Sequence, residues 1–305
     1  MFLISLLQVQ KFRGKMGDNM ADKNYLHTAY ANSADGTDGF TTVYPNLNLL
    51  VNSSAKTKDG FFKNFDKVEN GYGEVTMKGT NTWVTKDLGD GFSIQPRNYK
   101  PGDKYTMSMD VMFTSWNLPA GTTITEFWLG QRYFGGSGKH ICSIDLPKDP
   151  SKMLNQWIRI TQTSTIPPYD DPSVSTQAIF TVGFFAPSEG SLTIRVRKPK
   201  QEEGSVATPH MTSSSEVTTA DWPKYVGTYV DTNQTSSTEP SKYDWDEMKY
   251  RVYLDGTPIG GSKLLSFDLE NLKAGTSYNV QVSQINGNVE SDKSESVAFK
   301  TTLPK

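Results

Sequence analysis

The stretch LKAGTSYNVQV, residues 272–282, decides the fold class of the C-terminal part of this chain. Tyr278 stands at the start of an alternating strand, directly after a corner of the form L-x-x-G-T. In β-sandwiches this is the tyrosine-corner arrangement, in which the tyrosine hydroxyl hydrogen-bonds to the backbone a few residues upstream. The stretch therefore predicts a β-sandwich that is closed at this corner by Tyr278.

Alternation with a period of two continues upstream of the corner and predicts strands through most of the chain. In residues 104–113, KYTMSMDVMF, every second side chain from Tyr105 to Phe113 is apolar, and residues 191–199, SLTIRVRKP, alternate in the same way. Residues 178–186, AIFTVGFFA, form a nearly continuous apolar run, which predicts a strand buried on both faces. Clusters of Gly, Pro, Asn and Asp separate these runs, so the pattern is typical of an all-β sandwich or barrel.

Length, charge and cysteine content restrict the function further. The 305 residues favour two domains, or one large domain with an extension. A formal net charge of −2 gives no basic surface for the phosphates of a nucleic acid or for a membrane. The single cysteine, Cys142, excludes an intrachain disulfide framework. The apolar run MFLISLL at residues 1–7 is short and follows no basic residue, so we expect no signal peptide.

Changes of composition along the chain predict four segments. We expect an N-terminal arm over residues 1–38 and a first β domain over 39–207. A Ser/Thr/Pro-rich connector over 208–245 and a second β unit over 246–305 follow. The second unit has roughly sixty residues, whereas a complete sandwich of this class needs about 100. Its first strands are therefore either missing or supplied by the connector.

Two resemblances to known families follow from these residues. The corner at 272–282, together with YRVYLDG at 250–256 and ESVAFKTT at 295–302, resembles a fibronectin type III domain. The stretch TAYANSADGTDGFTTVYPNLNLL at 28–50, with KPKQEEGSVATP at 198–209 and ADWPKYVGTYVD at 220–231, resembles virion structural proteins of phages that infect Gram-positive, especially lactic-acid, bacteria.

The second resemblance implies a fold, a location and partners. It implies a jelly-roll β-sandwich like a carbohydrate-binding module, followed by a partial immunoglobulin-like sandwich of the fibronectin type III class. It also implies a part of the tail, baseplate, collar or head fibre that is made in the host cytoplasm, attaches to other virion proteins through its N-terminal arm and forms a homo-oligomer. The Asp-Gly-rich stretch DGTDGFTTVY at 35–44 would link this arm to the sandwich, or would be an ordinary first strand.

Residues for catalysis or for metal binding do not form a recognisable pattern. The three histidines, His27, His140 and His210, are scattered, and no G-x-S-x-G motif occurs. The glycine run before His140 lacks the Ser or Thr of a phosphate loop. We therefore expect no catalytic residue, no metal and no cofactor. A pair of glycosidase carboxylates stays open, because their spacing in space cannot be read from the sequence; the candidates are Glu126, Asp145, Glu189, Glu202 and Glu203.

Saccharide binding is the positive hypothesis, because sugars rest their C–H faces on aromatic rings beside planar polar side chains. The stretch WLGQRYF at 128–134 supplies that mixture in Trp128, Arg132 and Tyr133, provided that Trp128 faces outward. Trp83 and Trp116, with Arg97, are further candidates. The alternative is that these tryptophans belong to the core, as tryptophans in sandwiches commonly do.

These observations favour a virion structural protein that binds host cell-wall polysaccharide during adsorption and is not an enzyme. Three alternatives remain open from the sequence: a structural decoration without a ligand, a polysaccharide depolymerase, and a bacterial surface adhesin. The absence of an export signal disfavours the adhesin.

Overall fold

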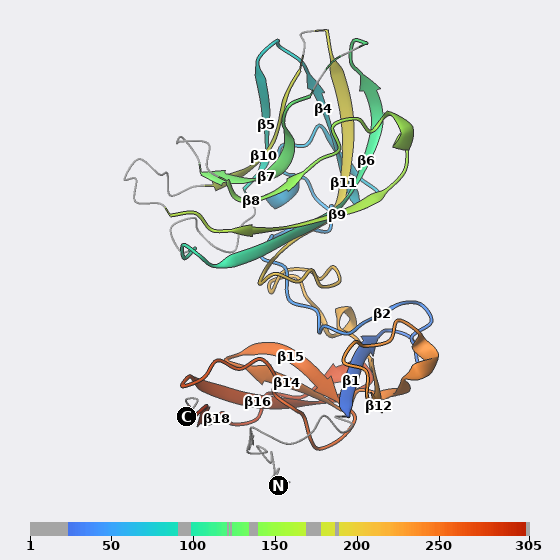
Figure 1. Ribbon diagram of the computed structural model, residues 1–305, viewed down its shortest axis with the longest axis vertical. Coiled ribbons are helices and arrows are strands. Elements are labelled where there is room, and N and C mark those ends of the chain that lie inside the picture. The colour runs from blue at the N-terminus through green and yellow to red at the C-terminus, as the bar shows by residue number, and fades with distance from the viewer. Residues whose placement is uncertain are drawn as a thin grey trace. The chain divides into compact units, whose positions relative to one another are not determined.

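A computed structural model describes residues 24–90, 99–120, 122, 124–133, 140–168, 178–186 and 189–302 of the chain; the side chains of residues 132, 133, 140, 178 and 179 lie outside this description. These residues form β-strands and short 3-10 turns, without an α-helix in the described ranges (Figure 1). The chain divides into two compact units. We call Leu47–Val217 the jelly-roll unit, and Met1–Asn46 with Thr218–Lys305 the split unit, because it is built from both ends of the chain. The all-β prediction is confirmed.

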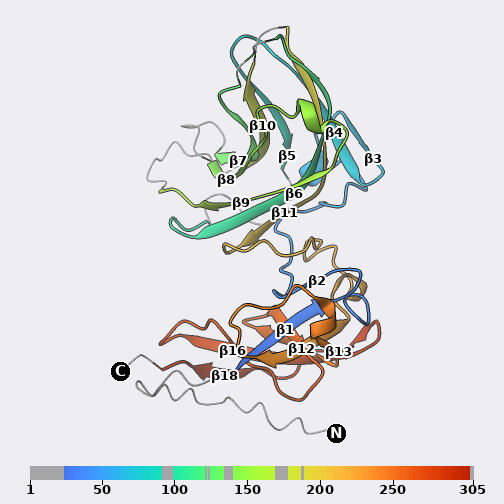
Figure 2. The ribbon, with the colours of Figure 1, turned by 45° about the vertical axis from the view of Figure 1, so that its right-hand side comes forward.

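The jelly-roll unit contains two antiparallel sheets, drawn as separate layers in Figures 1 and 2. The first sheet has the order β5 (Trp83–Gly89), β10 (Ala178–Phe185), β7 (Phe127–Tyr133) and β8 (His140–Asp145). The second has the order β3 (Lys67–Glu69), β4 (Tyr72–Lys78), β11 (Ser191–Glu203), β6 (Lys104–Asn117) and β9 (Ile158–Thr165).

The core of the jelly-roll unit is formed by the alternating side chains that the sequence indicates. From β6, Met107, Met109 and Val111 are fully buried, and Phe180 and Val182 of β10 belong to the same apolar cluster. A large-to-small change at such a site costs about 2–5 kcal/mol, because the removed atoms lose both transfer free energy and packing. This cluster therefore fixes which faces of β5, β7 and β10 point outward.

The prediction for the apolar run at 178–186 is only partly right. Phe180, Val182 and Phe184 of β10 point into the core, and Thr181 and Gly183 are also buried on the opposite face. Phe185, in contrast, is 41% exposed. The C-terminal end of the run is apolar on both faces of the strand because the Phe185 side chain lies on the surface. The outer face is not covered at that position.

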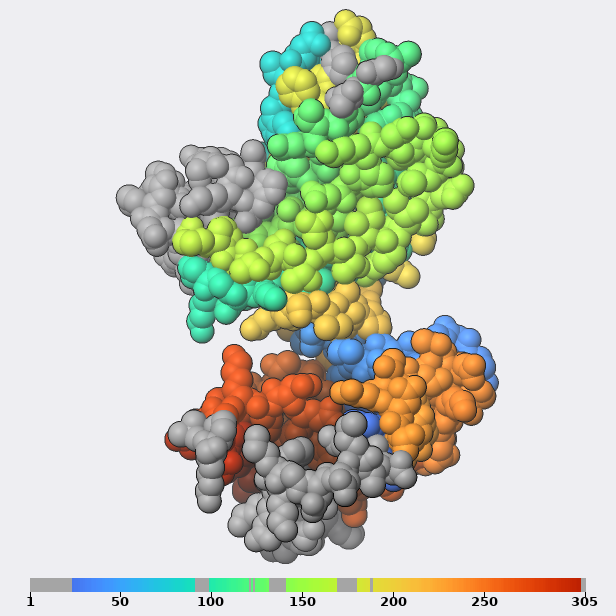
Figure 3. All heavy atoms as spheres, in the orientation of Figure 1, coloured from blue at the N-terminus to red at the C-terminus, as the bar shows by residue number. Residues whose placement is uncertain are grey.

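The split unit also contains two sheets. One has the order β13 (Asp244–Glu247), β12 (Tyr225–Asp231), β1 (Tyr25–Ala31) and β2 (Phe40–Thr41). The other has the order β15 (Thr257–Ser262), β14 (Tyr250–Leu254), β16 (Ser277–Asn286) and β17 (Val289–Glu290), with β18 (Val297–Lys300) paired to β16. In Figure 3 the blue N-terminal segment and the orange segment that precedes β14 adjoin on the surface of this unit.

The described part of the expected arm and residues 218–245 of the expected connector belong to the split unit, whereas residues 208–217 belong to the jelly-roll unit. All seven residues of β1 pair with β12, in a register from Tyr25 opposite Asp231 to Ala31 opposite Tyr225. Arg251 of β14 contacts the segments that follow β2 and precede β12, since its Nε donates to the Tyr44 hydroxyl at 3.0 Å and its guanidinium lies 4.8 Å from the Trp222 ring centroid. The incomplete sandwich that the sequence indicates is therefore completed by strands from the arm and from the connector.

The tyrosine corner is confirmed. The Tyr278 hydroxyl, at the start of β16, accepts a hydrogen bond from the backbone N–H of Lys273 at 2.9 Å. Gly275 has φ +66° in this corner, a conformation that glycine adopts without the steric cost of a Cβ atom.

Candidate functional site

Three aromatic side chains gather on the outer face of the sheet that contains β5, β10 and β7. Trp83 of β5 is 38% exposed and stands directly opposite Phe185 of β10 in the antiparallel register. Trp128 of β7 is stacked beside Trp83, with ring centroids 6.1 Å apart and an interplanar angle of 27°. We call Trp83, Trp128 and Phe185 the aromatic face.

Alternation in each strand places these three rings on one side of the sheet. Phe127 and Leu129, the neighbours of Trp128, point into the core, and Phe184, the neighbour of Phe185, does so too. Val84 packs against the same core, so Trp83 points the other way. Because successive side chains of a strand point to opposite faces, burial of these neighbours in the core directs the three aromatic rings outward.

Gly183 has no side chain, and this leaves room for the indoles of Trp83 and Trp128 to lie against the sheet. A Cβ atom at this position would stand 3.1 Å from ring atoms of both Trp83 and Trp128. That separation is tighter than an ordinary van der Waals contact, so a larger residue here would push the indoles away from the sheet. The glycine in the middle of β10 thus serves close approach of side chains.

Polar side chains border the aromatic face on both sides. On the β5 side, the Thr181 hydroxyl donates to Asp87 Oδ1 at 3.2 Å. On the β8 side, Asp145 is exposed and stands opposite Trp128 in the register. Its backbone N–H donates to Gln162 Oε1 at 2.8 Å. Rings flanked by carboxylates and an amide can stack on a sugar ring and accept hydrogen bonds from its hydroxyls.

The structure places the sequence-predicted residues in different environments. Trp128 lies on the outer face, as the hypothesis requires, but is only 5% exposed. Trp116 of β6 packs into the core, 5.9 Å from Phe113 in an edge-to-face contact. Trp83 is the exposed tryptophan of the set. The side chains of Arg132 and Tyr133, and all of Arg97, lie outside the described residues.

Sequence reasoning missed Phe185. The signal was present, because a strand whose Phe184 points into the core must direct the next side chain outward. The continuous apolar run concealed that alternation.

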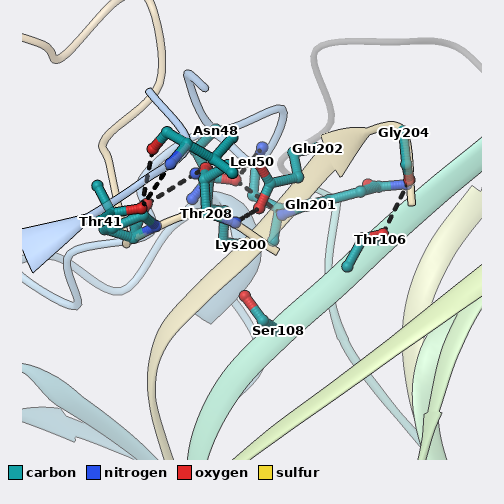
Figure 4. Close-up of polar contacts among 12 residues, drawn as sticks. Thr41, Asn48, Leu50, Thr106, Ser108, Lys200, Gln201, Glu202, Gly204 and Thr208 are labelled. Atoms are coloured by element: carbon teal, nitrogen blue, oxygen red, sulfur yellow. Dashed lines mark hydrogen bonds and ion pairs between the residues drawn. The ribbon is translucent and has the colours of Figure 1, made fainter. Parts of the chain in front are cut away.

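A second polar cluster of the jelly-roll unit is buried and structural (Figure 4). The ammonium of Lys200 lies 3.3 Å from Glu202 and donates to Thr208, while Glu202 accepts from the Thr208 N–H and hydroxyl at 2.9 and 2.6 Å. Burial lowers the pKa of Lys200 to about 8. Asn48 completes the cluster, since its amide donates to the Pro199 carbonyl and accepts from the Gln201 N–H.

This cluster closes the end of the jelly-roll unit and gives no access to a ligand. Lys200 and Glu202 are 0% and 1% exposed. Lys198 beside them has φ +49°, where the pairing of β11 with β6 shifts register. The charged pair thus holds an irregular strand end against the segment that follows it. This pairing removes Glu202 from the glycosidase candidates.

Cys142, His27 and His210 do not combine an accessible nucleophile with a neighbouring base. Cys142 is fully buried, and burial raises the pKa of its thiol to about 12. His210 contacts Ser53 at 3.4 Å, but the hydroxyl is fully buried and burial lowers the pKa of this histidine to about 4. His27 is buried and bonded to Ser236 and Asp231. Among the described residues no group of three possible metal ligands occurs.

Among the described residues, no helix is long and apolar enough to cross a membrane.

Comparisons with known proteins agree with this division of the chain. Residues 57–199 match the family described as BppA domain 1, and residues 223–281 match the family described as Minor structural protein 5-like, C-terminal domain. The first match lies within the jelly-roll unit and the second within the split unit. No curated protein matches the sequence.

Solved structures add one strong similarity. A chain in the structure described as "the tripod (BppUct-A-L) from the baseplate of bacteriophage Tuc2009" is 87% identical, with a TM-score of 0.89; the match covers 94% of this chain and 100% of that one. A structure described as "CBM4 structure and function" is 10% identical with a TM-score of 0.29; the match covers 46% of this chain and 92% of that one. The chain belongs to the family of phage baseplate tripod proteins, and is a structural protein of the virion.

Proposed function

We propose that the jelly-roll unit binds a saccharide of the host cell surface through the aromatic face, and that it does so without catalysing a reaction. The observation that carries this proposal is the exposed cross-strand pair of Trp83 and Phe185 on the outer face of the first sheet. Exposed aromatic side chains that adjoin on a folded surface are uncommon away from binding sites. The family description of this unit as a BppA domain, in a baseplate protein, agrees with a role in adsorption.

The physical basis of binding is stacking on an aromatic ring that is already held in place. The buried Trp128 is stacked beside Trp83 and supports the exposed indole before the ligand arrives. A preformed ring costs little conformational entropy on binding, and each immobilised side chain would otherwise cost about 0.5–1.5 kcal/mol. Asp87 and Asp145 at the borders then accept hydrogen bonds from sugar hydroxyls.

Binding of the purified full chain to intact host cells and to their extracted wall polysaccharide tests the proposal. Trp83→Ala and Phe185→Ala should each weaken saccharide binding about tenfold or more, the loss typical of a central aromatic contact. Trp157→Ala is the matched control, because Trp157 is a half-buried indole of the same unit that stacks on Arg197 of the second sheet, away from the aromatic face. Equal binding by all three variants and the native chain would contradict the proposal.

The non-enzymatic part of the proposal has its own test. Incubation of wall polysaccharide with the full chain should release no reducing ends above the level of a chain-free control. Release that Asp145→Asn abolishes would instead show a depolymerase.

We also propose that the split unit attaches the protein to the other virion proteins. The sequence predicts that the N-terminal arm anchors the protein, and the described part of this arm contains β1, a strand of the split unit. The relative's structure is a tripod of several baseplate components, so we assign this chain to an oligomeric assembly with other baseplate proteins. Removal of residues 1–46 should abolish assembly together with folding of the split unit, whereas saccharide binding by the jelly-roll unit should persist.

A further inference from the structure

The sandwich of the split unit is open along one side of β1. Strand β2 pairs only with Tyr30 and Ala31 of β1, and no other described strand pairs with residues 26–29 on that side. In an antiparallel strand, alternate residues direct their N–H and C=O groups away from the paired neighbour. The edge of β1 therefore presents backbone donors and acceptors that a further strand could pair with.

A cavity of about 530 Å³ is lined in part by β1, and we call it the β1 groove. On the first sheet it is lined by Leu26, Thr28 and Tyr30 of β1 and by Val226 and Thr228 of β12. Opposite them lie Leu254 and Ile259 of the other sheet and residues of the segment 262–271. That segment follows β15 and forms no strand. The groove therefore lies between the two sheets of the split unit and includes Leu26 and Thr28, in the part of β1 that β2 leaves unpaired.

The groove exposes side chains that a closed sandwich would cover. Leu26 points to the same face of β1 as Tyr30, whose hydroxyl reaches Gly260 of the facing sheet, yet Leu26 is 51% exposed. Leu264, on the opposite wall, is 62% exposed. Apolar side chains exposed on both walls of one groove indicate a binding surface.

The rim of the groove is acidic. Asp268 and Glu270 line it, are exposed, and form no ion pair among the described residues. Lys263, the basic residue of the same segment, is neutralised by Asp244 at 2.8 Å. A partner that complements this rim would carry Lys or Arg beside its apolar side chains.

We propose that the β1 groove receives an extended segment of another baseplate subunit, with alternating apolar residues flanked by basic ones, which pairs with the edge of β1. Backbone hydrogen bonds to β1 would give affinity, and the apolar side chains between Leu26 and Leu264 would give register and specificity. This inference rests on membership in the baseplate assembly, and is independent of saccharide binding by the jelly-roll unit.

Hydrogen exchange of the native full chain tests the backbone contact. The chain is compared alone and in the tripod obtained by co-expression with the other tripod subunits. Peptides that cover residues 25–31 should become protected on assembly, whereas peptides from β9 in the jelly-roll unit should not change. Unchanged exchange over 25–31 in the assembled tripod would overturn the proposal.

Substitutions test the side-chain contact. Leu26→Asp and Leu264→Asp should each weaken assembly about tenfold or more, because a carboxylate would be buried in an apolar contact beside an acidic rim. Val297→Asp is the matched control, since Val297 is 59% exposed in the same unit but does not line the groove. Each variant should keep the melting temperature and the saccharide affinity of the native chain.

Two results would overturn the proposal. One is assembly of both leucine variants at the level of Val297→Asp. The other is self-association of the isolated chain that the leucine variants abolish, because a second copy would then be the occupant. Since saccharide binding is measured on the same variants, its failure and the failure of the groove proposal remain distinguishable.

Discussion

Replacing Lys200 by methionine should destabilise the jelly-roll unit strongly. The ammonium is fully buried and lies 3.3 Å from Glu202, which is itself 1% exposed. Removing one partner of a buried ion pair leaves the other charge uncompensated, at a cost of about 3–5 kcal/mol. Glu202 would retain the two hydrogen bonds from Thr208, so we expect the lower end, about 3 kcal/mol.

The double variant Lys200→Met/Glu202→Leu separates the charge effect from packing. With both ionisable groups removed, no buried charge remains, and replacement of such a pair by apolar residues is commonly near neutral. Thr208 and the Pro209 carbonyl lose their partners, which costs about 1–3 kcal/mol. The double variant should therefore be no less stable than the single variant Lys200→Met.

Thermal and urea unfolding of the full chain measure these differences. For a domain of this size, 3 kcal/mol corresponds to about 6–12 °C in melting temperature. Hydrogen exchange of the β6 and β11 amides, measured in parallel, shows whether the unfolding transition is that of the jelly-roll unit. A loss below about 1 kcal/mol for Lys200→Met, or a double variant that loses the sum of both single variants, would refute the reasoning.

Four further changes have defined outcomes. Gly183→Val should displace the two indoles and abolish binding to wall polysaccharide, measured by titration, while β6 keeps its protection from exchange. Tyr278→Phe should lower the free energy of unfolding of the split unit by about 0.5–1.5 kcal/mol in urea, because the Lys273 N–H loses its acceptor. Burial lowers the pKa of His210 to about 4, so the unfolded chain binds a proton at a higher pH than the folded chain. The free energy of unfolding should therefore fall as the pH drops from 6.5 towards 4, and His210→Gln should reduce this dependence when urea unfolding is measured over that pH range. Arg251→Met should cost the split unit about 3 kcal/mol in the same assay, since Glu290 loses its buried partner.

Local patterns predicted the strands, because a strand's period of two depends only on residues near each other. The alternation around Met107 and Met109 predicted β6, and the corner before Tyr278 predicted β16 and its hydrogen bond. The pairing of β1 with β12 could not be predicted, because Tyr25 and its partner Asp231 lie about two hundred residues apart. No local signal states which distant strand completes a sandwich.

The sequence predicted two of the aromatic residues of the candidate site, but not which of their side chains is exposed to solvent. Trp83 and Trp128 were both named, and only the structure shows that Trp83 is the exposed ring and that Trp128 supports it. Burial of an outward-facing tryptophan depends on neighbours from other strands. Phe185 joins the site through its register with Trp83, which is again a long-range property.

The structure of the full chain in complex with an oligosaccharide released from the host cell wall tests the central claim most directly. The account predicts a sugar ring stacked on the Trp83 indole, in contact with Phe185, with hydroxyls bonded to Asp145 or Asp87. A sugar bound at another surface, with the aromatic face bare, would contradict it.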